Sequence, residues 1–358
     1  MDKRFWLGLK LIPVLDKKIK TITDSFESAE RIWLADRNGL SKIDGIAINE
    51  VDEIITRRNN IDLERWWQRY KNIGINILTI FDDDYPPLLR EITNPPTVLF
   101  FKGDLILNYS NAVAIVGSRL ASIHGSIIAE ELASELSKEG VTVVSGVARG
   151  IDGSAHKGAM RGQGGTIGVL GCSLDVIYPP ENKKLYGEIC KHGSLVSEYP
   201  ITTKPLKWNF PARNRIISGL TKGVVIVEAS EKSGALITAD FALEQGREVC
   251  AVPGNPKNKL SKGPHKLLKS GAYLVEDAGD ILDVLGLIGH SEKKKESSVE
   301  ISLDEQRVLN FIDWELKHVD EITRELNVSS SDAAILLTIL EIKGLIKQDI
   351  GKRYLRIH

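Results

Sequence analysis

The feature that most constrains the fold is a succession of short apolar runs separated by helical segments between residues 111 and 286. Most runs are continuous rather than alternating, which is typical of strands buried on both faces of a sheet. The segments between them, such as 126–140 and 235–248, place apolar residues on one helical stripe. Repeated strand–helix units predict an α/β fold with a Rossmann-like, doubly wound, mostly parallel sheet. The runs are VAIVG (113–117), VTVVSG (141–146), TIGVLG (166–171), LVSEY (195–199), VVIVEA (224–229), VCAVPG (249–254) and AYLVE (272–276).

The region before this core has a different texture. Residues 1–80 carry apolar residues at helical intervals, which predicts several short helices in a SAM-like or helix-hairpin-helix-like domain. Gly45 lies between two such segments, and a helix pair of this kind either offers backbone N–H groups to phosphate or simply packs as a helical module. Residues 81–110 contain four prolines and three successive acids, which predicts a connector leading to a strand at Val98–Lys102.

The region after the core also separates into two parts. The core domain is expected to span 111–288, and residues 289–300, GHSEKKKESSVE, are polar and charged as in a linker. Residues 301–358 then give three helical patterns followed by two short strands. This order predicts a winged helix-turn-helix domain at the C-terminus.

Composition excludes a globally basic surface, because the 358 residues hold 47 Lys and Arg against 48 Asp and Glu, a net charge of −1. A local basic patch stays open. Cys172, Cys190 and Cys250 are too few and too widely spaced for a disulfide framework or a zinc site. The first residues lack a signal-peptide pattern, and no run of about 18 uncharged apolar residues occurs, so we expect a cytoplasmic protein without a membrane span.

Small residues and arginines follow the expected strands, where an open parallel sheet binds its ligands. Gly117-Ser118-Arg119 follows the first strand, and the loop after the second contains Gly146 and Arg149. These loops are either simple turns or anion sites. Ser233 and Gly234 precede a helix and resemble a helix N-terminal anion site. Neither G-x-G-x-x-G nor a P-loop is present, so a dinucleotide site is disfavoured and a single mononucleotide site stays open.

Charge segregation is the more informative signal. Residues 199–227 contain no acid, and Trp208 and Phe210 lie among their cations. Residues 249–275 are also free of acids. Cations that follow a phosphate backbone, together with rings that stack on bases, suit single-stranded nucleic acid. The alternative is a loop face that is simply solvated, and this alternative has more weight for the second window, 249–275, than for the first. The cations are Lys204, Lys207, Arg213, Arg215 and Lys222 in the first window, and Lys257, Lys259, Lys262, Lys266 and Lys269 in the second.

Catalytic patterns are weak. Asp152 and His156 are four residues apart, which suits a shared helix face, but no nucleophile is positioned beside them. His124 and His156 lack the spacing of metal ligands. We therefore expect no catalytic residue, no metal and no cofactor.

The motifs taken in order resemble the DNA processing protein DprA (Smf) family. The resemblance covers about residues 95–285 and rests on VAIVGSR, VVSGVARGIDGSAHKGAM, TIGVLGCSLDVIYPPEN, NFPARNRIISGL, VVIVEASEKSGALITADFALEQGREVCAVPG and GPHKLLKSGA. It implies a non-enzymatic protein that binds single-stranded DNA as a homodimer. It further implies that the protein protects incoming DNA in natural transformation and helps load the RecA recombinase.

The resemblance also assigns residues. Arg119 matches the family's DNA-contacting arginine, and Phe210 to Arg215 match its pocket motif. The basic residue after Y-P-x-x-N falls at Lys183 or Lys184, and Arg149 is an added cation in SGVARGID, where the family usually has SGLAxGID. The residues expected at the DNA are Gly117, Ser118, Arg119, Gly146, Arg149, Lys183, Lys184, Lys207, Phe210, Arg213, Asn214, Arg215, Ser233, Gly234 and Thr238.

Two other functions stay open beside this one. A nucleoside-monophosphate phosphoribohydrolase would need a P-G-G-x-G-T-x-x-E loop, but the stretch after the fifth strand reads EASEKSGALITAD. A regulator that binds duplex DNA through the winged helix would need cations on its recognition helix, where SDAAILLTILEIKG holds only Lys343.

Self-association is expected through the late part of the core. Leu267, Leu268 and Tyr273 lie near the last strand, and a sheet edge needs cover that a second subunit can provide. The alternative is that these side chains pack on the chain's own helices. The family resemblance, which implies dimers formed through the core, favours association.

Overall fold

The computed structural model describes residues 2–25, 28–103, 111–287, 301–312, 316–326, 328–349 and 351–356. The chain divides into two compact units, Met1–His290 and Ser291–His358. The linker expected at 289–300 lies outside the described residues. None of the described helices combines the length and apolar character that crossing a membrane requires.

A mixed sheet of nine strands forms the centre of the first unit. The strands β3 to β9 run parallel to one another, and β2 at one end of the sheet pairs antiparallel with both β6 and the edge strand β1. The order β1-β2-β6-β5-β4-β3-β7-β8-β9 reverses its direction beside β3, so the fold is doubly wound as expected. The strands are β1 (Asn76–Thr79), β2 (Val98–Gly103), β3 (Ala112–Val116), β4 (Thr142–Ser145), β5 (Thr166–Leu170), β6 (Gly193–Ser197), β7 (Gly223–Ile226), β8 (Glu248–Ala251) and β9 (Tyr273–Leu274).

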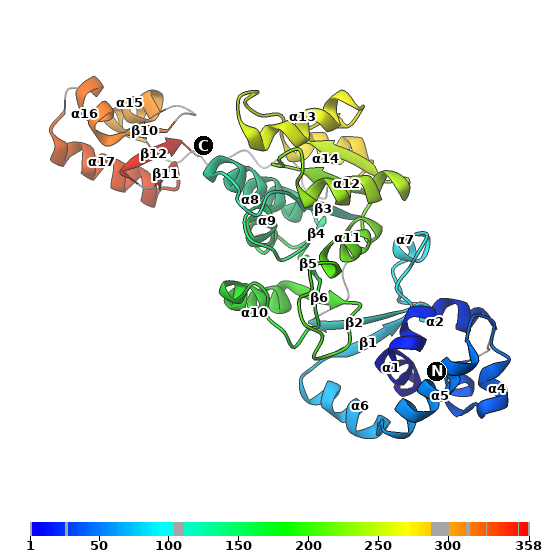
Figure 1. The fold of residues 1–358 in the computed structure, drawn as a ribbon. Coiled ribbons are helices and arrows are strands. Elements are labelled where there is room, and N and C mark those ends of the chain that lie inside the picture. Colours follow the sequence, from blue (N-terminus) through cyan, green and yellow to red (C-terminus); the bar gives the residue numbers. More distant parts are fainter. Residues whose placement is uncertain are drawn as a thin grey trace. The chain divides into compact units, whose positions relative to one another are not determined.

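The central strand β3 shows why its sequence is continuously apolar. Ala112, Ala114 and Val116 join the cluster formed with α11 and α12, whereas Val113 and Ile115 join the cluster with α8, α9 and α14 on the opposite face. Figure 1 shows α8 and α9 on one side of the sheet and α11 and α12 on the other. The helices of this region are α8 (Ile123–Lys138), α9 (Ile151–Ala159), α10 (Lys183–His192), α11 (Asn209–Gly219), α12 (Gly234–Glu244), α13 (Lys262–Lys269) and α14 (Ala278–Leu285), with 3-10 turns at Pro180–Asn182 and Lys259–Ser261.

Six helices precede the sheet and pack against it. Their apolar side chains share one cluster with sheet residues such as Phe100 and Leu170. The rings of Tyr70 in α6 and Phe100 in β2 lie 5.2 Å apart at this contact. The helices are α1 (Lys3–Leu11), α2 (Pro13–Ser25), α3 (Ala29–Leu34), α4 (Arg37–Ser41), α5 (Ile48–Asn59) and α6 (Leu63–Asn72), and a short α7 (Pro87–Arg90) follows within the connector.

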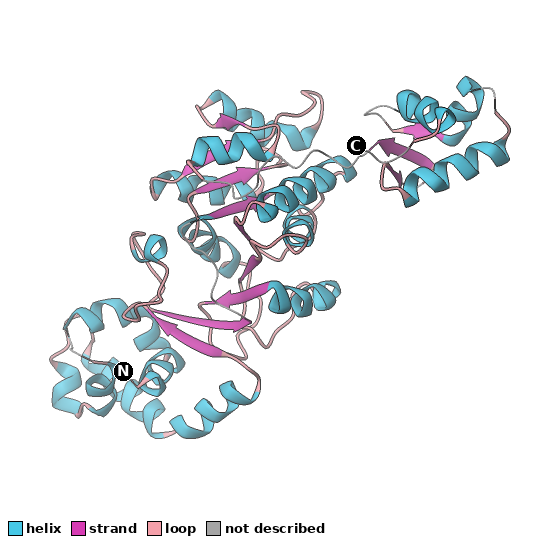
Figure 2. Ribbon diagram, turned by 180° about the vertical axis from the view of Figure 1, so that it is seen from behind, coloured by secondary structure: helices cyan, strands magenta, loops and turns pink. Residues whose placement is uncertain are grey.

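Strand β1 departs from the expectation of helices alone in residues 1–80. Its four residues pair antiparallel with β2, from Asn76 opposite Phe101 to Thr79 opposite Val98. Figure 2 shows this pair as two long arrows between the N-terminal helices and the rest of the sheet. The stretch is too short for a periodicity to appear in the sequence, and pairing with β2 decides its conformation.

The second unit is a small winged helix. Three helices enclose an apolar core that includes Val308, Ile322 and Leu337, and a three-stranded sheet in the order β10-β12-β11 completes it. The expected helices and two strands are present, and the two-residue strand β10 is an addition. The elements are α15 (Leu303–Ile312), β10 (Lys317–His318), α16 (Val319–Leu326), α17 (Ser330–Ile342), β11 (Ile346–Asp349) and β12 (Arg353–Arg356).

Candidate nucleic-acid interface

The loops that follow β3, β4 and β7 meet where the strand order reverses. Gly117 and Gly146 begin the first two loops, and neither position has room for a side chain. A Cβ atom at Gly117 would lie 2.8 Å from the carbonyl oxygen of Glu228, and one at Gly146 would lie 2.5 Å from Oδ2 of Asp152. Small residues are therefore required for the loops to pack together here. A cavity of about 790 Å³ opens in front of them.

Most of the residues expected at the DNA line this cavity. They come from three separate stretches of the chain, which the doubly wound topology brings to one edge of the sheet. Gly146 and Arg149 line a smaller adjoining cavity of about 40 Å³, which shares Arg119, Phe210 and Arg213 with the large one. The expected residues that line the large cavity are Gly117, Ser118, Arg119, Lys207, Phe210, Arg213, Asn214, Ser233, Gly234 and Thr238.

The charges of the large cavity are mainly positive. Arg119, Lys207 and Arg213 line it, and Asp152 is the acid among its lining residues in the described part of the chain. Glu228, two residues after the end of β7, does not line the cavity: its carboxylate accepts from the backbone N–H of Ser122 at 2.8 Å and from the Ser122 hydroxyl at 2.6 Å. An anionic ligand therefore meets an excess of cations.

A stack of aromatic and cationic groups lies at the cavity wall. The guanidinium carbon of Arg119 lies 5.2 Å from the ring centroid of Phe210, and that ring lies 5.4 Å from the ring of Tyr178 at 39°. Gly171 makes room for Phe210, since a Cβ there would lie 2.7 Å from the ring. Sequence reasoning missed Tyr178, although it is the tyrosine of the Y-P-x-x-N element. The stack offers π surface beside a positive charge, which is what a nucleobase next to its phosphate can use.

Arg213 is expected from the sequence to contact DNA, but its side chain is held inside the protein. The residue is only 4% exposed. Its Nη1 donates to the carbonyl oxygens of Gly146, at 2.8 Å, and of Val169. Asp152, which is also buried, lies nearby, and burial raises the pKa of that carboxyl while the charge of Arg213 opposes the rise. Arg213 thus joins the ends of β4 and β5 and positions the loops around the cavity.

Arg215 lies outside both cavities. Its Nη2 donates to the two carboxylate oxygens of Glu198 at 2.8 and 2.7 Å. The pair is largely buried, with side-chain exposures of 12% and 19%. Glu198 lies one residue before the acid-free window 199–227, so the composition of that window does not predict this pairing. Because Glu198 neutralises its guanidinium, Arg215 is poorly suited to bind a phosphate of DNA.

Lys183 and Lys184 begin α10 and are exposed, but they line neither cavity. The turn before them is tied to the loop after β4, because Asn182 Nδ2 donates to the carbonyl oxygen of Val147 at 3.0 Å. Arg149 forms an ion pair with Glu181 in the same turn. The two lysines therefore lie next to the site, and Arg149 is a cation with a partner.

Helix α12 begins at the cavity. Ser233 is its N-cap, and its side chain accepts from the backbone N–H of Ala235. Asn214 Nδ2 donates to the carbonyl oxygen of Gly234 at 3.3 Å and so ties α11 to this terminus. The positive end of an eleven-residue helix therefore adds to the cations of the wall.

Potential catalytic and metal groups are engaged in structural contacts. His156 is fully buried, its Nδ1 lies 2.7 Å from Oγ1 of Thr166, and burial lowers the pKa of this imidazole to about 3. Burial likewise raises the pKa of the Cys172 thiol to about 11. Within the described ranges, no group of three His, Cys, Asp or Glu side chains could hold a metal ion.

The helix pair around Gly45 does not offer a free anion site. The carboxylate of Glu50 accepts from the backbone N–H of Ala47 at 2.7 Å, where α5 begins. Lys18 Nζ donates to this carboxylate and to the carbonyl oxygen of Gly45. The chain's own glutamate therefore occupies the place a phosphate would take, and the alternative of a plain packing module fits better.

The three residues proposed for self-association lie at the far edge of the sheet. Leu267 is partly buried against the apolar cluster of α11 and α12, and Leu268 is half-buried. Tyr273 is 46% exposed in the edge strand β9. Their role remains a prediction.

Comparison with known proteins identifies the family to which this fold and cavity belong. A family model described as DNA recombination-mediator protein A matches residues 76–286, and one described as DprA winged helix domain matches residues 292–352. The chain belongs to the DNA recombination-mediator protein A family. The resemblance inferred from the motifs is thereby confirmed.

Individual members of the family match over long stretches. Protein Smf of Synechocystis is 34% identical over 396 residues, which covers 99% of each chain. The X-ray structure of DNA processing protein A from Streptococcus pneumoniae is 36% identical, covers 79% of this chain and 98% of that one, and has a TM-score of 0.69. A structure that describes the single-stranded DNA binding mode of DNA processing protein A from Helicobacter pylori is 31% identical. It covers 60% of this chain and 97% of that one, and has a TM-score of 0.53.

Proposed function

We propose that the protein binds single-stranded DNA in the cavity at the carboxyl ends of β3, β4 and β7. The observation that carries the proposal is the stack of Arg119, Phe210 and Tyr178 in a wall whose cations outnumber its acids. Bases stack on the rings, and phosphates are drawn to Arg119, Lys207 and the N-terminus of α12. The relative from Helicobacter pylori, described by its single-stranded DNA binding mode, supports the same ligand.

The proposal is tested by fluorescence anisotropy with a labelled single strand and the matching duplex over a salt series. We expect tighter binding of the single strand, and a salt slope near −0.7 for each phosphate contacted. Equal affinity for the two forms, or a flat salt response, would refute the proposal.

The protein is proposed to act by binding rather than by catalysis, as a mediator that protects single strands and helps load the RecA recombinase. The family's description as a recombination mediator supports this role. The phosphoribohydrolase alternative is disfavoured, since Glu228 after β7 holds Ser122 and does not face the cavity. On single-stranded DNA coated with a single-strand-binding protein, we expect RecA filaments to assemble faster when this chain is added. An unchanged rate of assembly would contradict the role.

A duplex-binding role for the winged helix is disfavoured by the surface of α17. Ile335 and Ile342 are 58% and 81% exposed on this helix, and Lys343 at its end donates to Glu305 at 2.6 Å. An apolar helix whose cation already has a partner is a poor reader of a DNA groove. The proposed DNA contact therefore belongs to the first unit.

The protein is further proposed to act as a homodimer joined through the edge that carries Leu268 and Tyr273. The exposed apolar side chains Tyr273 and Leu274 on edge strand β9, 46% and 52% exposed, support an interface. Leu268→Glu should give a folded monomer in light scattering. A wild type that is monomeric at tens of micromolar, with and without DNA, would end this proposal.

A further inference from the structure

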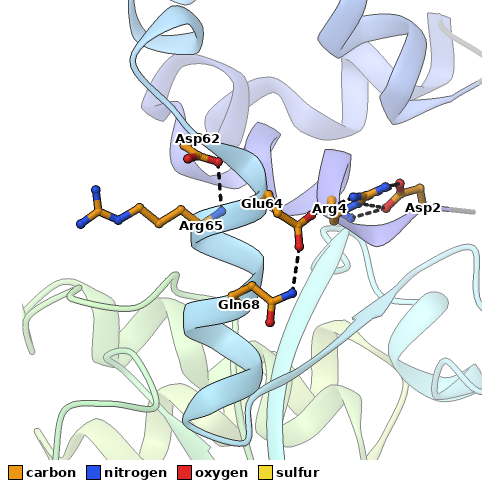
Figure 3. A network of polar contacts seen from close by, with 6 residues as sticks. All are labelled: Asp2, Arg4, Asp62, Glu64, Arg65 and Gln68. Atoms are coloured by element: carbon orange, nitrogen blue, oxygen red, sulfur yellow. Dashed lines mark hydrogen bonds and ion pairs between the residues drawn. The ribbon is translucent and has the colours of Figure 1, made fainter.

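Helix α6 presents two arginines with no acidic partner. Arg65 and Arg69 are four residues apart, which places them on one side of the helix, and both are exposed. No carboxylate within the described residues forms an ion pair with either. Figure 3 shows the guanidinium of Arg65 pointing away from the helix, on the side opposite Glu64 and Gln68.

Between Leu63 and Asn72, α6 contains one acid, Glu64, against the cations Arg65, Arg69 and Lys71. Glu64 accepts from Nη1 of Arg4 at 2.9 Å and from Nε2 of Gln68 at 2.8 Å, and Asp62 caps the helix by accepting from the backbone N–H of Arg65 (Figure 3). The unbalanced charge of α6 is therefore positive.

Aromatic rings accompany these cations. The guanidinium of Arg69 lies 5.4 Å from the ring centroid of Trp66, and the ammonium of Lys71 lies 5.4 Å from that of Trp67. Both tryptophans are only partly buried against the apolar cluster of the N-terminal helices. Cations interleaved with partly exposed rings are what a sequence-tolerant single-strand contact requires.

The helix lies next to the loop that leads into the cavity. The hydroxyl of Tyr70 accepts from the backbone N–H of Ile201 at 2.8 Å. Pro205, four residues further on, lines the cavity, so it lies at most about 14 Å from Ile201 along the chain.

The loop between the helix and the cavity carries the same chemistry. Lys204 and Lys207 are exposed, and Trp208 is 69% exposed. The acid at this junction is Asp175, whose carboxylate oxygens accept from the backbone N–H of Thr202 at 3.0 and 3.1 Å. Cations and rings thus occur both on this loop and on α6, and the Tyr70–Ile201 hydrogen bond joins the two elements.

We infer that Arg65 and Arg69 of α6 form a second contact for the same single strand, which passes from the cavity over Lys207, Trp208 and Lys204. The inference rests on the proposed function, because it extends the path of the bound strand. It assigns the N-terminal helices a direct role with the phosphate backbone, away from the helix pair at Gly45.

The test uses the full-length protein with the double substitution Arg65→Ala/Arg69→Ala. Binding is measured by anisotropy with a short oligothymidylate of about 6 nucleotides, which fills the cavity alone, and a long one of about 30 nucleotides, which reaches α6. We expect roughly fivefold or greater weakening for the long strand, a salt slope reduced by about 1.4 for two lost phosphate contacts, and unchanged binding of the short strand. Arg65→Lys/Arg69→Lys should retain most of the slope.

The matched control removes two exposed cations from α8 and α9, Lys138→Ala/Lys157→Ala, and should bind both strands as the wild type does. If the α6 variant binds the long strand with wild-type affinity and slope, the inference is wrong and the proposed function stands. Equal loss for both strand lengths also overturns it, because the effect then lies in the cavity. A wild type that binds neither strand would refute the proposed function itself.

Discussion

At the scale of single residues, Phe210 and Arg119 are expected to contribute to DNA binding in different ways, by stacking and by charge. Phe210→Ala should weaken single-strand binding by about 1–3 kcal/mol while the salt slope stays unchanged, because a lost stack releases no counterions. Arg119→Ala should weaken binding and lower the slope by about 0.7. Anisotropy over a salt series measures both quantities. If Phe210→Ala changes the slope as much as Arg119→Ala does, the ring does not stack on bases.

Arg213 is predicted to act on stability as well as on binding. Arg213→Ala removes two buried hydrogen bonds to the ends of β4 and β5, and it takes one of the positive charges away from the buried carboxyl of Asp152. Each buried carbonyl oxygen that loses its donor in this way costs about 1–3 kcal/mol of unfolding free energy. Urea unfolding checks this, with Arg119→Ala as a control that should stay close to wild type. A fully stable Arg213→Ala variant with a lower salt slope would instead make Arg213 a phosphate contact.

Glu131 gives the protein a predictable dependence of stability on pH. Burial, with Glu135 and Glu130 nearby, raises the pKa of this carboxyl to about 7, whereas it is about 4.3 in the unfolded chain. The folded state binds the proton of Glu131 more tightly than the unfolded chain does. The resulting contribution to the free energy of unfolding is fully present below about pH 4.3 and is lost as the pH rises through 7. Glu131→Gln should therefore be more stable than wild type by about 1 kcal/mol near pH 8, a value reduced for partial exposure, and should match it near pH 4. Equal unfolding free energies at pH 8 would contradict this.

At the scale of elements, the N-terminal helices and the winged helix differ in how they relate to the sheet. The helices share an apolar cluster with β2 and β5, and β1 pairs with β2. A cut near residue 95, which the motif boundaries suggest, would remove β1 and expose that cluster. A chain ending at residue 287 keeps every described element of the first unit.

The chain 1–287 is predicted to fold and to bind single strands within about twofold of the full chain, because the cavity and α6 both lie within it. Circular dichroism checks folding, and anisotropy checks affinity. A folded 1–287 chain that loses most of its affinity would place the DNA contact in the winged helix.

Much of this architecture could be predicted from the sequence, and the exceptions have physical causes. Continuous apolar runs revealed the seven parallel strands, because strands buried on both faces carry no competing pattern. The strand β1 is four residues long, and the partners of Arg213 and Arg215 come from Gly146, Val169 and Glu198. Such contacts depend on tertiary structure, and local composition cannot reveal them. The contact of Tyr178 with Phe210 likewise joins the loop after β5 to the first turn of α11, which is distant in sequence.

At the scale of the whole molecule, a net charge of −1 coexists with a local concentration of cations. Glu228 and Glu198 are paired and do not line the large cavity, whereas Arg119 and Lys207 do. Local placement of charge, rather than total charge, thus equips a near-neutral protein for a polyanion.

The central claim, that a single strand lies on the Arg119–Phe210–Tyr178 stack, is tested most directly by photocrosslinking. An oligothymidylate containing 5-iodouracil is irradiated with the full-length protein, and the crosslinked peptides are identified by mass spectrometry. The account predicts a crosslink to Tyr178 or Phe210 that Phe210→Ala diminishes. Crosslinks confined to the winged helix, with none in the loops after β3, β4 and β5, would contradict it.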